Sequence, residues 1–219
     1  MSSAEPTPNG PSLAEGPFLV VATSLFGDRL PLAEAYAELL ATDGVTRGLI
    51  GPREVPRLWD RHLLNCAVLG ELIDEGTAVI DVGSGAGLPG IPLAIARPDL
   101  QLMLVEPMLR RTTFLEEAVA ALGLDNVTVF RGRAEDCDVA APVVTARAVA
   151  DLGKLSRWCL PLVARGGELL AMKGGSAQEE MTEHARAIRK ARGGEPELVL
   201  CGVGMLEPPT TVVRVPRRG

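Results

Sequence analysis

The sequence predicts an α/β fold: a Rossmann-like, mostly parallel sheet of seven strands with helices on both faces, preceded by an N-terminal helical part. Two observations predict it. Short apolar runs alternate with amphipathic stretches from residue 77 to residue 192, which is typical of parallel strands joined by crossover helices. The first of these runs, 78–82, leads into a glycine-dense turn and then a helix, as a ligand-binding βαβ unit does.

The N-terminal part is predicted to hold two helices. Apolar residues recur at helical spacing over 31–40, and Pro31 suits the first turn of a helix. Glycines 44, 48 and 51 then indicate a loop. A longer helix is expected over 53–73, interrupted near Pro56.

The strands and helices of the main part follow from periodicity and from glycine or proline breaks. The predicted strands are 78–82, 100–106, 127–130, 143–147, 169–172, 198–203 and 211–215. The helices between them are 89–96, 110–122, 152–164 and 177–192. The last two strands are expected to close the sheet as an antiparallel pair.

Length and composition indicate a globular chain. Its 219 residues are 47% hydrophobic and 23% charged, which suits one domain, and no apolar run approaches the ~20 residues of a membrane span. Residues 1–16 hold three prolines, two glycines and few large apolar groups, so we expect a disordered tail there, followed by the helical part (17–76) and the main domain (77–219). No signal peptide opens the chain, and a cytoplasmic location is expected.

Charge and cysteine content exclude some functions. A net charge of −6 argues against a uniformly basic nucleic-acid-binding surface but allows a local basic face. Seven aromatic residues leave little for base stacking. The four cysteines are far apart without a C-x-x-C pair, and there are only two histidines, so no metal site is predicted.

The turn after the first strand carries the functional signal. Residues 79–93 read VIDVGSGAGLPGIPL, and Glu106 ends the next predicted strand. Glycine permits positive φ and close approach of a ligand, and an acid at the end of the second strand can accept hydrogen bonds from ribose hydroxyls. The G-x-G-x-G spacing differs from the dinucleotide fingerprint G-x-G-x-x-G and resembles the S-adenosylmethionine loop of class I methyltransferases. A tight turn without a ligand is the alternative.

Ligands of open α/β sheets bind beyond the carboxyl ends of the strands. That rule collects one set of candidate site residues: Asp81, Gly83, Ser84, Gly85, Gly87, Leu88, Glu106, Ala134, Glu135, Arg147 and Lys173. Arg147 stands out because it lies inside an apolar run, where an unpaired charge is costly. Alternatively, Glu135 is part of a solvated acidic loop and Lys173 is an ordinary surface lysine.

Four segments together resemble one family. They are IDVGSGAGLPGIPLAI at 80–95, RHLLN at 61–65, ARAVADL at 146–152 and MKGG at 172–175. They are similar to the glucose-inhibited division protein B family, also called ribosomal RNA small-subunit methyltransferase G. The resemblance implies a class I methyltransferase fold, S-adenosylmethionine as cofactor, and methylation of guanine N7 in 16S rRNA, within the small subunit or its precursor.

The resemblance also implies roles for individual residues. Cofactor contacts are expected from Gly83, Leu88, Ala134, Glu135 and Arg147. The RNA-facing side is expected to include Arg61, His62, Arg110, Arg133, Arg147 and Lys173. The chain departs from the family pattern at Asn65, where an aspartate is common, and at Thr210 or Thr211, near which an arginine is common.

Guanine N7 carries an in-plane lone pair and no proton, so its methylation requires alignment rather than a base. Arg147, Lys173 and His62 are the candidate catalytic residues, with Arg147 or Lys173 donating to guanine O6 or to a phosphate. His62 has an alternative reading as a hydrogen-bonded core residue. A monomer is expected. Three rival functions stay open: a nucleotide-dependent oxidoreductase, a small-molecule methyltransferase, and a non-catalytic rRNA-binding assembly factor.

Overall fold

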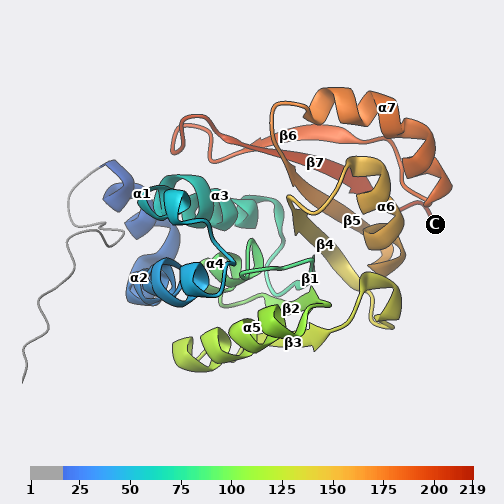
Figure 1. The fold of residues 1–219 in the computed structure, drawn as a ribbon. Coiled ribbons are helices and arrows are strands. Elements are labelled where there is room, and N and C mark those ends of the chain that lie inside the picture. Colours follow the sequence, from blue (N-terminus) through green and yellow to red (C-terminus); the bar gives the residue numbers. More distant parts are fainter. Residues whose placement is uncertain (1–16) are drawn as a thin grey trace, which may run out of the picture.

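Seven strands form a single sheet in the order β3-β2-β1-β4-β5-β7-β6 (Figure 1). The structure, a computed structural model, describes residues 17–219, so the tail expected over 1–16 lies outside the described residues. The strands are β1 Ala78–Val82, β2 Gln101–Glu106, β3 Val127–Arg131, β4 Ala141–Arg147, β5 Val163–Lys173, β6 Glu197–Cys201 and β7 Thr210–Pro216. β3, β2, β1, β4 and β5 are parallel, and β7 and β6 close the edge as the predicted antiparallel pair.

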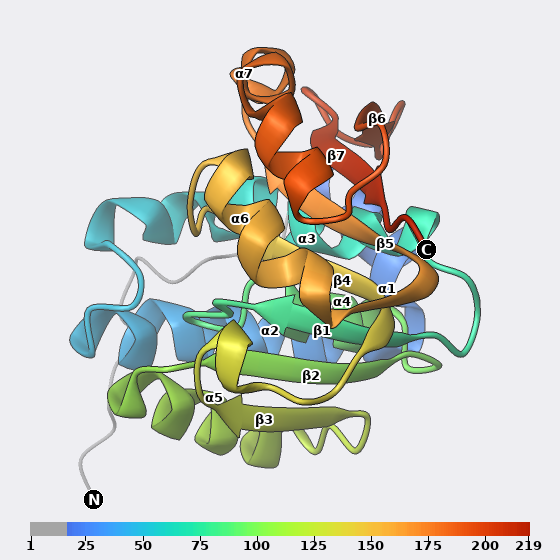
Figure 2. The ribbon, with the colours of Figure 1, turned by 90° about the vertical axis from the view of Figure 1, so that its right-hand side faces the viewer.

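The order of the strands places the site. From β1 the chain moves outward through β2 and β3, which lie side by side in Figure 2, and it then returns to the other side of β1 as β4. Ligands in open α/β sheets bind where the strand order reverses, here between β1 and β4. The carboxyl ends of β1, β2, β3 and β4 all lie at this edge because the four strands are parallel.

Helices cover both faces, as predicted. The helices are α1 Pro17–Phe26, α2 Leu30–Leu39, α3 Leu64–Ala67, α4 Gly90–Ala96, α5 Leu109–Leu122, α6 Leu152–Cys159 and α7 Ala177–Lys190. Helices α1 to α5 share one core with Val79 of β1, including the buried Tyr36, Leu64, Leu93 and Phe114. Helices α6 and α7 share a second core with the other face of β1. The N-terminal helical part is therefore packed on the sheet.

The structure corrects three helical segments, and it also changes three strands: β4 begins at Ala141, β5 begins at Val163, and β6 ends at Cys201. Helix α1 was not predicted, since its ten residues, PFLVVATSLF, are apolar almost throughout and show no helical periodicity. The predicted helix 53–73 is a helical stretch built from short pieces: 3₁₀ over Pro52–Arg57, π over Leu58–Leu63, then α3, then 3₁₀ over Val68–Leu72.

The third correction concerns the predicted helix 152–164. Helix α6 ends at Cys159, a 3₁₀ turn spans Leu160–Leu162, and Val163 already belongs to β5. Pro161 lacks the N–H that a continued helix needs. The chain then passes so close to β4 that a Cβ at Gly167 would lie 2.2 Å from the carbonyl oxygen of Pro142.

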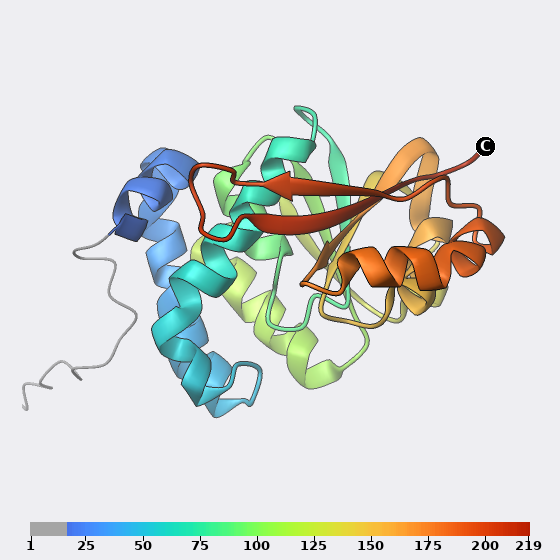
Figure 3. The ribbon, with the colours of Figure 1, turned by 90° about the horizontal axis from the view of Figure 1, so that it is seen from above.

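The β6–β7 hairpin reaches from the sheet towards the N-terminal helices (Figure 3). At its turn, the Gly202 N–H donates to Glu71 Oε2 at 3.0 Å. Thr210 donates to the side-chain oxygen of Asn65. The resemblance implied departures from the family pattern at Asn65 and at Thr210 or Thr211, and the structure joins Asn65 and Thr210 as a neutral hydrogen-bonded pair.

Candidate active site

The glycine turn adopts a conformation that only glycine accommodates readily. Gly83, Gly85 and Gly87 have φ of +71°, +61° and +99°. The N–H groups of Gly83 and Ser84 donate to the Val105 carbonyl at 2.8 and 3.2 Å, which ties the turn to β2. Tyr36 of α2, buried beneath the turn, donates to the Ala86 carbonyl at 2.7 Å. The turn is therefore held from both the sheet and the N-terminal part.

Asp81 supports the turn from behind rather than lining its open side. Its side chain is fully buried, and Oδ2 accepts hydrogen bonds from Ser84 Oγ at 2.6 Å and from the Gly90 N–H at 3.0 Å. Oδ1 is buried without a hydrogen-bond partner. Burial raises the pKa of this carboxyl to about 6. Asp81 thus links the end of β1 to the first turn of α4.

Glu106 lies at the end of β2, where the sequence predicted a ribose-binding acid, and its side chain is also buried. Oε2 accepts from the Gly85 N–H at 3.1 Å, and Oε1 accepts from the Met108 N–H at 3.0 Å. Arg111 lies 3.5 Å from Oε2. The carboxylate thus joins the glycine turn to the start of α5.

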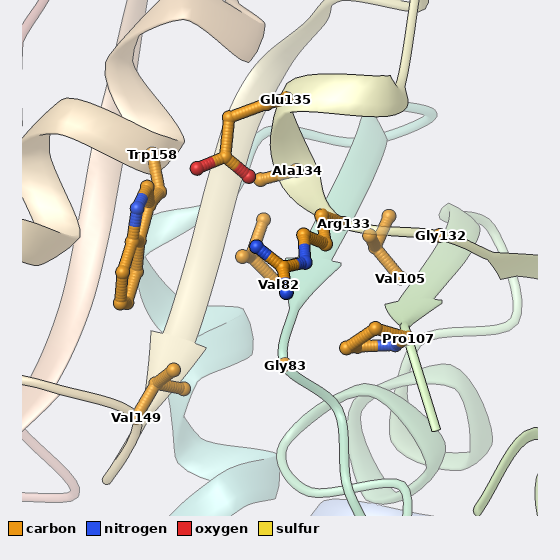
Figure 4. Close-up of a pocket in the computed structure, with 10 residues that line it drawn as sticks. All are labelled: Val82, Gly83, Val105, Pro107, Gly132, Arg133, Ala134, Glu135, Val149 and Trp158. Carbon is orange, nitrogen blue, oxygen red and sulfur yellow. The ribbon is translucent and has the colours of Figure 1, made fainter. Parts of the chain in front are cut away.

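A cavity of about 280 Å³ opens beside the turn (Figure 4). Its lining comes from the carboxyl ends of β1 and β2, the loop after β3 with the 3₁₀ turn Ala134–Asp136, the loop after β4, and α6: Val82, Gly83, Val105, Pro107, Gly132, Arg133, Ala134, Glu135, Val149 and Trp158. In Figure 4, Trp158 and Val149 lie on one side and Val105 and Pro107 on the other, Glu135 lies at the margin, and the guanidinium of Arg133 extends between the two sides. The cavity suits a flat, largely apolar ring.

The predicted cofactor residues fall into two groups. Gly83, Ala134 and Glu135 line the cavity. The others, Asp81, Ser84, Gly85, Gly87, Leu88, Glu106 and Arg147, belong to the turn, its supports or the neighbouring end of β4 and do not line it. Trp158 and Val149 line the cavity without having been predicted, because nothing in their sequence surroundings distinguishes them from core residues of α6 and the preceding loop.

Arg147, at the end of β4, is held by the N-terminal part. One terminal nitrogen donates to Cys66 Sγ at 3.1 Å. The other donates to the Arg61 carbonyl at 2.8 Å and lies 3.0 Å from His62 Nδ1. No carboxylate forms an ion pair with this guanidinium within residues 17–219. Its positive charge therefore has no direct carboxylate partner, and the nearest electrostatic influence from an acid is that of the buried Asp81.

His62 is fixed between Arg147 and a glutamate that the sequence did not reveal. Nε2 of His62 lies 2.9 Å from Glu54 Oε2, and Arg61 pairs with Oε1 of the same carboxylate at 3.1 Å. Because a guanidinium only donates, Nδ1 must accept from Arg147 and Nε2 must carry the proton that it donates to Glu54. Burial and the Arg147 charge lower the pKa of His62. Glu54 lies in a 3₁₀ segment, so no α-helical spacing relates it to His62.

The sequence left two interpretations of Lys173 open, a residue of the site and an ordinary surface lysine, and the structure matches neither fully. Its side chain is only 9% exposed, so it is not a surface lysine. Nζ donates to Glu180 Oε2 at 2.7 Å and to the Ala150 carbonyl at 2.8 Å. Glu180 also accepts from the Leu152 N–H at 2.8 Å. Lys173 and Glu180 therefore hold the loop 148–151, which places Val149 against Gly83.

The remaining predicted RNA-facing arginines are exposed. Arg133 lines the cavity, Arg110 lies in the first turn of α5, and Arg61 pairs with Glu54. No group of three or more His, Cys, Asp or Glu side chains suits a metal ion in the described part of the chain. None of its helices is long and apolar enough to cross a membrane.

The fold and this site define a class I S-adenosylmethionine-dependent methyltransferase. Solved structures share the fold: the structure of M. jannaschii TYW2 in complex with AdoMet is 16% identical, with a TM-score of 0.58 over 74% of this chain and 78% of that one. A putative S-adenosyl-L-methionine-dependent methyltransferase from Methanococcus maripaludis also gives 0.58, at 13% identity over 81% and 90%.

The sequence comparisons go further than the fold. The family model of rRNA small subunit methyltransferase G matches residues 29–204, and the chain belongs to this family. Proteins named ribosomal RNA small subunit methyltransferase G from Salinispora tropica and Rhodococcus jostii are 60% and 57% identical to it. The matches cover 90% and 96% of this chain and 85% and 94% of those proteins.

Proposed function

We propose that this enzyme transfers a methyl group from S-adenosylmethionine to N7 of a guanine in 16S rRNA, in the small ribosomal subunit or its precursor. The observation that carries the proposal is the apolar cavity beside the glycine turn, with the cation of Arg147, which has no ion-pair partner within residues 17–219, at the neighbouring strand end. The relatives named for small-subunit rRNA support the choice of substrate.

The residues present fit this cofactor. The cavity between Trp158 and Val105 is apolar and suits a purine ring, and Glu135 at its margin offers a carboxylate for polar groups. Val149 approaches the turn at Gly83. A side chain at Gly83 would not fit there, because its Cβ would lie 2.8 Å from Val149. The cofactor supplies an electrophilic methyl group bonded to a sulfonium sulfur.

The contribution of the protein is alignment. Because guanine N7 has a free lone pair, no base is required, and holding the two reactants at near-attack distance can contribute up to ~7–11 kcal/mol. We assign this role to Arg147, which donates to guanine O6 or to a flanking phosphate. Lys173 is engaged with Glu180 and Ala150, so we assign it to positioning the loop over Gly83.

A ribosomal substrate supports a cytoplasmic location. The four cysteines are free and buried, which suits a reducing compartment. We expect the enzyme to act as a monomer. Arg61, Arg110 and Arg133 surround the site as exposed cations and are our candidates for phosphate contacts near the target guanine.

The substitution Arg147→Ala tests the proposal. We expect kcat/KM on unmethylated small subunits to fall by at least ~100-fold, because an interaction made with the reacting base is lost. Calorimetry should show a folded protein that still binds S-adenosylmethionine. Mass spectrometry of rRNA digests measures N7-methylguanine, and Arg157→Ala, at an exposed position of α6, is the control. Methylation by Arg147→Ala at the rate of the control would remove Arg147 from the site.

A further inference from the structure

The charges of this acidic chain are unevenly distributed. Three segments, 164–168, 186–197 and 214–219, contain eight of the 22 lysines and arginines but only three of the 28 acidic residues. The rest of the chain contains fourteen basic and twenty-five acidic residues. A local excess of positive charge in a protein with a net charge of −6 predicts a specific anionic partner for that part of the surface.

The fold brings these three segments together. The Arg218 N–H donates to the Arg192 carbonyl at 2.8 Å, and the Arg217 N–H donates to the Gly167 carbonyl at 2.9 Å. The Gly194 N–H donates to the Pro216 carbonyl at 2.7 Å. The C-terminus, the end of α7 and the turn before β5 thus gather at one end of the molecule (right-hand side of Figures 1 and 3).

Six of these cations are exposed and form what we call the distal basic surface: Arg165, Arg186, Arg189, Lys190, Arg192 and Arg218. Within residues 17–219 none of the six forms an ion pair. Of the nearby acids, Glu168 and Glu197 instead pair with Arg214, at 3.1 and 4.0 Å. Of the acids in the three segments this leaves Glu195, and the exposed Glu183 lies one turn before Arg186 on α7. The six cations therefore outnumber the unpaired acids beside them.

The distal basic surface is separate from the active site. β5 pairs with the end of β7 at Glu168 and reaches the active-site edge at Lys173. Those five residue steps correspond to about 17 Å. Along α7, Arg186 lies a further six residues, about 9 Å, beyond Glu180, which contacts Lys173. The methylation proposed above does not use these cations.

We propose that the distal basic surface binds the phosphate backbone of 16S rRNA at a helix other than the one that carries the target guanine. The inference rests on the proposed function. Within residues 17–219 none of the six cations lies over an aromatic ring, which suits phosphates rather than unstacked bases. Backbone contacts carry no sequence information but fix orientation. Two separated contacts would orient an acidic enzyme on a large folded RNA.

The test neutralises three cations of α7 in one variant, Arg186→Gln, Arg189→Gln and Lys190→Gln, because glutamine is also a good helix former. The matched control, Gln101→Glu, Ala121→Glu and Thr128→Glu, changes the net charge by the same amount at exposed positions on the other side of the sheet. We would measure binding to protein-free 16S rRNA and to small subunits between ~50 and ~200 mM salt, together with the methylation rate at saturating substrate.

We expect the α7 variant to bind both substrates at least ~10-fold more weakly. The slope of log K against log salt concentration should become shallower by ~2–3, because fewer phosphates are contacted. The kcat and the S-adenosylmethionine affinity should stay unchanged. The control should match the wild type. Equal losses in control and variant would contradict the proposal, because net charge alone would explain them. A loss on subunits but not on protein-free RNA would also contradict it, by assigning the surface to a ribosomal protein. If the wild type bound RNA normally but did not methylate it, the proposed function would be overturned, whereas the proposed role of the distal basic surface would stand.

Discussion

At the scale of single residues, Arg147 has the most consequential environment. A half-buried guanidinium is ordinarily matched by a carboxylate, whereas Arg147 is held by a thiol, a carbonyl and a neutral imidazole. These partners fix its position without cancelling its charge. The arrangement depends on the protonation state of His62, because a second ring proton would face the guanidinium.

That dependence predicts an acidic limit to activity. As pH falls through the pKa of His62, Nδ1 gains a proton, the contact with Arg147 is lost and kcat/KM should fall. Glu54 raises this pKa and Arg61 lowers it. We therefore expect Glu54→Gln to move the acidic limit to lower pH and Arg61→Gln to move it to higher pH. Initial rates across the pH range measure both; equal losses at every pH would mean that the two residues are only structural.

Asp81 predicts a pH dependence of stability. Its pKa is about 6 in the folded protein and ~3.9 in an unfolded chain. Folding therefore takes up a proton between about pH 4 and 6, and the folded state loses up to ~3 kcal/mol from this group as pH rises through that window. Asp81→Asn keeps an oxygen for Ser84 and Gly90 and cannot ionise. Urea unfolding from pH 4 to 7 should show a smaller decline with pH in this variant than in the wild type.

At the scale of elements, the sequence predicted what local patterns encode. β1 matches residue for residue, and α2, α4, α5 and β2 match to within one residue at each end, because proline, glycine and alternating polarity mark their limits. The prediction of a helix over 152–164 was wrong at its C-terminal end. The chain turns into β5 there because of the close approach of Gly167 to Pro142, which is a tertiary contact. Glu54 and Trp158 were missed for the same reason: their partners, His62 and the cavity, are brought to them only by the fold.

The loop 148–151 gives the prediction at this scale. If Lys173 acts by holding this loop through Glu180, then Lys173→Met and Glu180→Met should have the same effect: a loss of about 1–3 kcal/mol of stability and weaker S-adenosylmethionine binding. Denaturant unfolding and calorimetry measure these two quantities. A Lys173 variant that binds the cofactor normally but has a raised KM for subunits, unlike the Glu180 variant, would instead indicate direct contact with RNA.

At the scale of the whole molecule, the negative net charge and the local basic regions predict an enzyme that selects its RNA by shape. Carboxylates elsewhere on the surface would repel a polyanion, while the proposed active-site rim and the distal basic surface would attract it. Binding should therefore need an RNA large and folded enough to meet both regions together.

A short RNA should then be a poor substrate. We expect kcat/KM for a naked hairpin carrying the target guanine to be at least ~10-fold below that for small subunits, since the hairpin reaches the rim alone. Methyl transfer from labelled S-adenosylmethionine at ~100 mM salt measures both substrates under the same screening. Equal efficiency on the two would mean that the target helix alone supplies recognition.

The contacts between the N-terminal part and Arg147 also limit how far the enzyme can be shortened. A chain engineered to start at Ala78 would keep every strand and the whole glycine turn, yet it would lack Cys66, the Arg61 carbonyl and His62, and with them each contact that anchors the guanidinium. If Arg147 aligns the guanine as proposed, the smallest active form of this architecture is larger than its sheet, because it must keep the helices that precede β1.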